Sequence, residues 1–229
     1  NFTIFDDGET NSVCKTVLGR MGINQKDIAP NTLSYYVDHV KNLGWYSGAG
    51  LDQEAQLLAD DPRLWDLFLG YEAELHRSNA VDFGGLITGV LELFAKYPDV
   101  RAKYQRRFRY VMVDEYQDTN RAQFQLIRQL GEAHGNVCVV GDEDQSIYSW
   151  RGADIRNILD FEKVFPAARI IKLEQNYRSS KKIIDAAARL ISYNQERKGK
   201  ELWTDNPAWV LFDLLINQEY GLGNFVDPR

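Results

Sequence analysis

The sequence predicts an α/β fold in which a parallel sheet follows a helical segment. Two short apolar runs, residues 110–113 and 137–140, have the composition of strands that are buried on both faces of such a sheet. Between them, residues 121–130 carry apolar side chains at helical spacing. A strand, a helix and a second strand in this order imply a right-handed crossover, which makes the two strands parallel.

Helices without strand signals are expected ahead of the sheet. Helical spacing of apolar residues predicts four of them, over residues 7–21, 32–43, 53–59 and 62–76. Asn31 is suited to cap the second helix and Gly44 to end it. A fifth, amphipathic helix is expected within residues 80–97, with Asp82 as its cap and the sheet as its packing partner.

The beginning of a second α/β domain is expected after the sheet. One helix is predicted over residues 154–165, and Pro166 stops it. A third apolar strand over residues 170–173 and a helix over residues 180–194 would then open the next domain.

Composition places the chain among ordinary globular proteins, with 229 residues of which 44% are hydrophobic and 26% charged. The formal net charge of -6 argues against a protein that holds nucleic acid by bulk charge, so any DNA contact must rely on local groups. Three basic clusters occur, at residues 101–109, 178–182 and 197–200. Each cluster, taken alone, is better explained as a solvated helix face.

Cysteine and histidine usage argues against a transition-metal site. The two cysteines lie far apart, and Cys138, inside an apolar run, is expected to be a small core residue. No CxxC or HExxH pattern occurs, and the three histidines are scattered. There is also no signal peptide and no apolar run long enough to span a bilayer, so a reducing, cytoplasmic setting is the default expectation.

Acidic residues follow both predicted strands. Asp114 and Glu115 come directly after the first strand, and Asp142 follows the second. Ligands of open α/β sheets bind in the crevice beyond the carboxyl ends of the strands, which makes these carboxylates candidates for binding Mg²⁺ and a nucleophilic water. The alternative, that each carboxylate only caps the helix after it, stays open at this point.

The residues after Asp142 add groups that suit phosphate and unpaired bases. Gln145 has a neutral amide that can hydrogen-bond a terminal phosphate, whereas the side chains of Trp150 and Arg151, with Tyr148 nearby, have faces on which bases stack. Further along, Arg178 could bring positive charge to a phosphoryl transition state, and Tyr177 could stack on a purine.

Three motifs together carry a family resemblance. VMVDEYQDTN, VVGDEDQSIYSWRGA and LEQNYRSS, in this order and spacing, resemble three consecutive motifs of the superfamily 1A DNA helicases related to UvrD, Rep and PcrA. The resemblance extends from residue 1 to about residue 205 and includes the LWTDN segment. It implies part of a RecA-like P-loop NTPase motor domain, an all-helical inserted subdomain and the start of a second RecA-like domain. The implied boundaries are residues 1–75 for the helical inserted subdomain, 76–167 for the part of the first motor domain and 168–205 for the start of the second, followed by a divergent tail, 206–229.

The resemblance also implies roles at an ATP site. Asp114 would hold Mg²⁺, and Glu115 would activate the attacking water. Gln145 would contact the γ-phosphate and link it to the DNA site. Tyr177 would stack on adenine, and Arg178 would act as an arginine finger.

On the DNA side, the resemblance implies that Trp150 stacks on a base of single-stranded DNA while Tyr148 and Arg151 support the strand. The implied activity is ATP-dependent 3′ to 5′ movement on single-stranded DNA with unwinding of duplex. Single-stranded DNA and single-strand/double-strand junctions would be the partners, and no membrane would be involved.

Two departures from the family bear on function. No G-x-x-x-x-G-K-[ST] loop occurs, so the phosphate-binding half of the ATP site is missing and the chain is expected to be an internal helicase piece, inactive by itself. The tail NPAWVLFDLLINQEYGLG is similar instead to a stretch of phage tail-tip host-specificity proteins. Two alternatives therefore stay open: a non-catalytic DNA-binding or interaction module of helicase origin, and a chimera with a phage tail protein.

Overall fold

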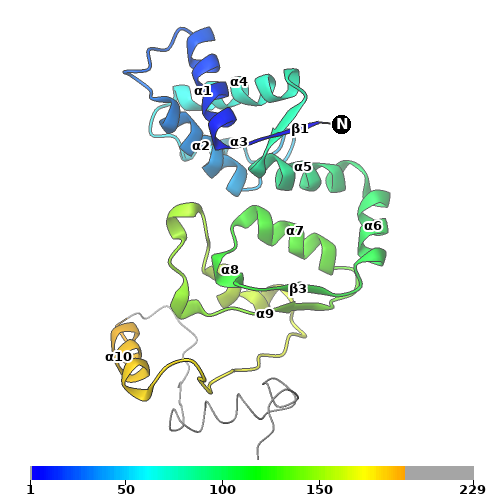
Figure 1. Ribbon diagram of the computed structural model, residues 1–229. Coiled ribbons are helices and arrows are strands. Elements are labelled where there is room, and N and C mark those ends of the chain that lie inside the picture. Colours follow the sequence, from blue (N-terminus) through cyan, green and yellow to red (C-terminus); the bar gives the residue numbers. More distant parts are fainter. Residues whose placement is uncertain (1, 194–229) are drawn as a thin grey trace, which may run out of the picture. The chain divides into compact units, whose positions relative to one another are not determined.

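The computed structural model describes residues 2–193 of the chain. The chain divides after Asp160 into two compact units, Asn1–Asp160 and Phe161–Arg229 (Figure 1). The first unit contains a helical region and the parallel strands with acidic ends. The four-part division expected from the sequence stays a prediction, and the tail over residues 206–229 lies outside the described residues.

The helical region runs from the first strand to the second. Its elements are β1 (Thr3–Phe5), α1 (Asp7–Arg20), α2 (Pro30–Asn42), α3 (Asp52–Leu57), α4 (Arg63–Arg77) and β2 (Ala80–Asp82). The apolar faces of α1, α2 and α4 meet in a core in which Leu18, Leu33 and Phe68 are fully buried. Burial of each such side chain contributes about 1.5 to 3 kcal/mol to the stability of the unit.

Two details of the helical region differ from the sequence-based expectation. Strands occur in a segment for which only helices were predicted: β1 pairs with β2 in parallel, with Phe5 opposite Asp82. Each strand has three residues, which is too short for a recognisable pattern. In addition, α2 begins at Pro30 instead of after Asn31, because the fixed φ of proline suits the first helical position and its missing N–H is not needed there.

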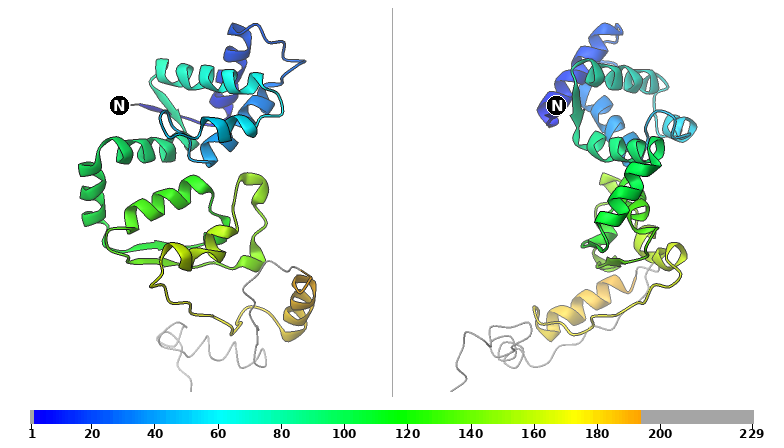
Figure 2. Two further views of the ribbon diagram at one scale, coloured as in Figure 1. Left: turned by 180° about the vertical axis from the view of Figure 1, so that it is seen from behind. Right: turned by 90° about the vertical axis from the view of Figure 1, so that its right-hand side faces the viewer.

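The second part of the first unit carries the acidic strand ends. Its elements are α5 (Phe83–Lys96), α6 (Pro98–Arg107), β3 (Val111–Val113), η1 (Tyr116–Asp118), α7 (Arg121–Gly131), β4 (Val137–Val139), η2 (Glu143–Gln145), η3 (Ser149–Arg151) and α8 (Arg156–Leu159). As predicted, β3 and β4 are parallel and are joined through a helix, with Val111 opposite Val137. Helix α5 packs mainly against β2, α2, α6 and α7, and α7 packs against β3. The predicted packing of α5 directly on the sheet is therefore wrong, because α7 occupies that position (Figures 1 and 2).

The prediction that both strands are buried on two faces is also wrong. Met112 is 77% exposed, Tyr110 is 79% exposed, and Cys138 is exposed rather than part of the core. Side chains alternate between the faces of a sheet, and α7 covers the face to which Val111 and Val113 point. In the described part of the chain, the other face is therefore open to solvent.

The second unit contains α9 (Phe161–Val164) and α10 (Lys181–Ile191) among its described residues. The predicted helix over residues 180–194 is confirmed as α10 as far as the structure describes it. Residues 170–173 form no strand, however, and Ile171 and Leu173 are more than 70% exposed. A strand needs a partner for its backbone hydrogen bonds, and no described strand pairs with this run. The single helix expected over residues 154–165 is instead two short ones, α8 and α9.

A buried ion pair holds α2 to the start of α5. The Nζ atom of Lys41 lies 2.8 Å from both carboxylate oxygens of Asp82, and both side chains are buried. The Tyr71 hydroxyl donates to Asp82 at 2.7 Å, and the Gly85 N–H donates to it at 2.6 Å, which confirms Asp82 as the cap of α5. Burial, with the negative charge of Asp82 acting in the same direction, raises the pKa of the Tyr71 phenol. Groups from three helices, α2, α4 and α5, therefore donate hydrogen bonds to one carboxylate.

The different burial of the two cysteines gives a testable prediction. Burial raises the pKa of the Cys14 thiol to about 12, and Asp38 acts in the same direction, whereas Cys138 is exposed. Because the thiolate is the nucleophile that attacks a disulfide reagent, we expect DTNB near pH 8 to modify Cys138 alone in the folded chain. Cys14 should react only in denaturant, and Cys138→Ser should abolish the reaction of the folded chain. Fast reaction of both thiols without denaturant would contradict the burial of Cys14.

Among the described residues, no helix is long and apolar enough to cross a membrane.

Candidate functional site

The acidic pair lies at the carboxyl end of β3, where the backbone turns sharply. Asp114 and Glu115 are both exposed, and Glu115 has a φ of 51°, in the left-handed region that non-glycine residues seldom adopt. The carboxylate of Asp114 accepts a hydrogen bond from the Glu115 N–H at 2.9 Å, which supports this turn. Such backbone strain is common where side chains are held for function, and here it accompanies two carboxylates at a strand end.

Gln117, a residue that was not predicted to belong to the site, joins the ends of the two strands. Its side chain is 1% exposed; Nε2 donates to the Glu115 carboxylate at 2.7 Å, and Oε1 accepts from the Asp142 N–H at 3.0 Å. The amide therefore fixes one oxygen of Glu115 relative to the residue that begins the next loop. The sequence shows only part of this role. A glutamine in the acidic motif needs hydrogen-bond partners for its N–H and its oxygen if it is buried. Which groups serve as partners depends on how the strands pair.

The loop after β4 is held close to the same strand end. The Tyr116 N–H donates to the Val140 carbonyl at 3.0 Å, so the ladder between the strands continues into the acidic turn. A Cβ atom on Gly141 would lie 2.6 Å from Oε1 of Gln117, which explains the glycine at this position. Gln145 is exposed, and its Nε2 donates to Asp142 at 2.7 Å. The structure thus brings Gln145 and the acidic pair to one edge of the sheet.

Three aromatic and cationic side chains form a cluster on η3 and the residue before it. Trp150 is 59% exposed, and the Arg151 guanidinium carbon lies 4.6 Å from the centroid of its ring. The same carbon lies 5.3 Å from the ring of Tyr148, whose centroid is 6.4 Å from that of Trp150. We call Tyr148, Trp150 and Arg151 the stacking cluster. Its exposed faces can stack on unpaired bases, and its guanidinium can pair with phosphate.

Tyr177 and Arg178 belong to the second compact unit. Both are exposed; the Tyr177 hydroxyl donates to Gln175 at 2.5 Å, and the Arg178 backbone N–H donates to the Asn176 side chain at 3.0 Å. The predicted site residues of the first unit therefore form two groups, the acidic pair with Gln145 and the stacking cluster. Tyr177 and Arg178 lie in the second unit. The role assigned to each of the eight residues stays a prediction.

The donor set at the strand end is suited to Mg²⁺. Magnesium keeps several waters and binds to proteins through one or two carboxylates together with substrate phosphates. Asp114 and Glu115 provide such carboxylates, and they are accessible at the strand end. In the described part of the chain, no group of three or more acidic, histidine or cysteine side chains is placed to hold a metal ion.

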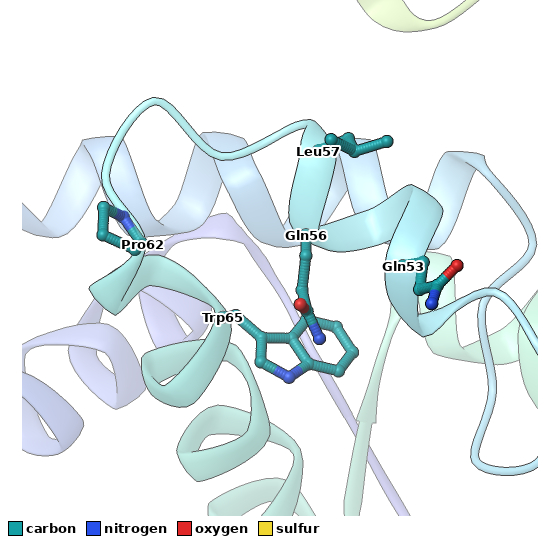
Figure 3. Close-up of a pocket in the computed structure, with 5 residues that line it drawn as sticks. All are labelled: Gln53, Gln56, Leu57, Pro62 and Trp65. Atoms are coloured by element: carbon teal, nitrogen blue, oxygen red, sulfur yellow. The ribbon is translucent and has the colours of Figure 1, made fainter.

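Two surface cavities, each of about 460 Å³, lie elsewhere in the first unit. One is lined by Gln53, Gln56, Leu57, Pro62 and Trp65 (Figure 3). The other lies where α1, α2 and α5 begin, and Asp7, Asp38 and Asp82 are among its lining residues. Neither of these two cavities is lined by a predicted site residue.

Comparison with known proteins agrees with this arrangement. Residues 1–166 match the family described as the UvrD/REP helicase N-terminal domain. The ATP-dependent DNA helicase PcrA of Bacillus subtilis (strain 168) is 42% identical over 234 residues, which cover 99% of this chain and 30% of that protein. PcrA of Staphylococcus aureus (strain Mu50) is 46% identical over 210 residues, which cover 90% of this chain and 28% of that protein.

The chain spans less than a third of the length of these relatives. The match to the Bacillus protein extends into residues 206–229, and the similarity of this tail to a phage protein stays a prediction. The matches nevertheless confirm the resemblance carried by the three motifs. This chain belongs to the UvrD/Rep helicase family.

Proposed function

We propose that this chain forms one side of the motor of an ATP-dependent DNA helicase, which couples ATP hydrolysis to 3′ to 5′ movement on single-stranded DNA. The observation that carries this proposal is the joining of the two strand ends by Gln117. Through it, the acidic pair and Gln145 lie at one edge of the sheet, and the same short loop leads on to the stacking cluster. A phosphate site and a base-stacking site on one continuous segment are what coupling of ATP and DNA requires.

On the nucleotide side, Asp114 would hold Mg²⁺ and Glu115 would accept a proton from the attacking water. Bound Mg²⁺ would supply positive charge that stabilises the charge on the transferring phosphoryl group. The hydrogen bond from Gln117 keeps one oxygen of Glu115 oriented and leaves the other free of that bond. Gln145 would contact the γ-phosphate, and its attachment to Asp142 would connect nucleotide occupancy to the position of the loop.

The family resemblance assigns two further residues to ATP. Arg178 would stabilise the transition-state charge, and Tyr177 would stack on adenine. The printed sequence contains no G-x-x-x-x-G-K-[ST] loop, so we propose that polypeptide outside this chain supplies the phosphate-binding loop. Single-stranded DNA, and junctions between single-stranded and double-stranded DNA, would be the substrates, and a cytoplasmic location fits them.

The same missing loop favours a second candidate function for the chain taken alone: a DNA-binding module without ATP chemistry. Both candidate functions use the stacking cluster to bind DNA, and only the first uses the acidic pair to hydrolyse ATP. DNA binding by this chain that does not respond to ATP, together with a lack of turnover when the missing loop is restored, would favour the second candidate.

The DNA side is tested by Trp150→Ala. We expect this variant to bind a fluorescein-labelled oligothymidine about 1 to 3 kcal/mol more weakly, as one stacked base contributes, when binding is followed by fluorescence anisotropy. Tyr35→Ala is the matched control, since Tyr35 is a 60% exposed aromatic residue on α2 outside the cluster, and its affinity should be unchanged. Equal affinities of Trp150→Ala and the unchanged chain would contradict the proposed DNA contact.

A further inference from the structure

The side chain of Asn42 connects three segments that are far apart in the sequence. Asn42 is the last residue of α2 and is half-buried. Its Nδ2 donates to the backbone carbonyl of Arg151 at 3.1 Å, and its Oδ1 accepts from Nδ2 of Asn120 at 2.7 Å. One amide thus contacts both the backbone of the stacking cluster and the last residue of the motif VMVDEYQDTN.

Asn120 has a defined role that leaves one group available for this contact. It caps α7: its Oδ1 accepts from the Gln123 N–H at 2.9 Å, and its own N–H donates to the Gln123 side chain at 2.9 Å. Helix capping therefore uses the oxygen of its amide, and Nδ2 is directed to Asn42. The backbone of Asn120 also forms a β-bridge with Ala153, so the start of α7 and the end of the loop with the stacking cluster lie together.

Close packing at Gly152 shows that the contact is built into the loop. Gly152 has a φ of +83°, and a Cβ atom there would lie 3.1 Å from Cβ and Nδ2 of Asn42. Glycine is therefore favoured for two reasons: the positive φ, and the short distance between an added Cβ atom and Asn42. On the other side, Asn42 follows Lys41, whose buried ion pair with Asp82 anchors the end of α2. The amide accordingly has a rigid support.

We propose that Asn42 is a positioning residue that holds the stacking cluster in its DNA-binding arrangement and ties it to the start of α7. This inference rests on the proposed function, because it assigns the cluster to DNA. A loop held in its binding conformation loses less conformational entropy when a ligand binds. Loss of a hydrogen bond of ordinary strength should therefore weaken DNA binding about two- to tenfold.

Two neutral substitutions break the connection from opposite sides. Asn42→Ala removes both hydrogen bonds. Asn120→Ser keeps a good helix cap but removes the Nδ2 donor that reaches Asn42. Both avoid a new negative charge, which would repel DNA by itself. Asn24→Ala is the matched control, because the Asn24 side chain accepts only a local hydrogen bond, from the Lys26 N–H.

The experiment is a double-substitution cycle with Trp150→Ala, measured with labelled oligothymidine on chains shown to be folded by circular dichroism. Asn42→Ala should weaken binding two- to tenfold in the unchanged chain but have a clearly smaller effect in the Trp150→Ala background, since the cluster through which it acts has then lost its indole. A merely structural role would give the same loss in both backgrounds. Asn120→Ser should behave in the same way, and it carries the test if Asn42→Ala does not fold.

The outcomes separate this inference from the proposed function. If Trp150→Ala leaves the affinity unchanged, the proposed DNA contact fails and this inference fails with it. If Trp150→Ala weakens binding but Asn42→Ala and Asn120→Ser have no effect, or have equal effects in both backgrounds, only the role of Asn42 is overturned. Loss of binding in the Asn24→Ala control would also overturn it, because the effect would then not be specific to the contact.

Discussion

Replacement of Glu115 by glutamine is expected to reduce ATP turnover about 10²- to 10⁴-fold, the usual contribution of a general base. Because this chain spans 30% of the Bacillus subtilis relative, the assay uses a chimera in which the chain replaces the matching segment of that helicase. Glutamine keeps an oxygen that can accept the hydrogen bond from Gln117, so the strand ends stay joined while the basic oxygen is lost. Binding of a fluorescent ATP analogue should consequently be retained.

A matched substitution on the same unit separates this effect from a general change of charge. Glu132 follows α7, is exposed and pairs with Arg101 at 3.4 Å, so Glu132→Gln should leave turnover unchanged. Turnover of the Glu115→Gln chimera at the unmodified rate would show that another group activates the water. The second candidate function would be supported instead if the unmodified chimera bound DNA but did not hydrolyse ATP.

Replacement of Asp82 by alanine is expected to destabilise the first unit by at most about 3 to 5 kcal/mol, because removing one partner of a buried ion pair leaves the other charge only partly compensated. Lys41 is 3% exposed and would keep only Glu72, whose carboxylate is 2.7 Å away and partly solvated. The Tyr71 hydroxyl and the Gly85 N–H would lose their acceptor in the same step. Urea unfolding followed by circular dichroism measures the loss.

An exposed cap provides the comparison for Asp82. Asp6 caps α1 through a hydrogen bond from the Glu9 N–H at 2.9 Å, but it is exposed and has no buried cation as a partner. Asp6→Ala should therefore lower the free energy of unfolding by only about 1 kcal/mol, as loss of one helix cap does. If Asp82→Ala were no more costly than Asp6→Ala, the ion pair with Lys41 would make no net contribution to stability.

Much of the candidate site could be predicted because its residues lie within short continuous motifs. Asp114 and Glu115 are adjacent, and Gln145 and Trp150 share one loop, so their chemistry is visible without a fold. The parallel pairing of β3 and β4 followed from the handedness of crossovers, and Asp82 was correctly identified as a helix cap. Predictions that depended on burial were less successful: Cys138 is exposed, and residues 170–173 form no strand.

The sequence by itself therefore determined most helices of the first unit, the parallel pair β3 and β4, the acidic pair and the family. The tertiary structure alone decided which side chains hold these parts together. Lys41 and Asp82 are separated by 41 residues, Asn42 and Asn120 by 78, and Asn42 and Arg151 by 109. Periodicity and motif spacing are properties of a short segment, whereas a buried ion pair or a shared amide exists only after distant segments have packed. Gln117 and Asn42 became recognisable as positioning residues for this physical reason.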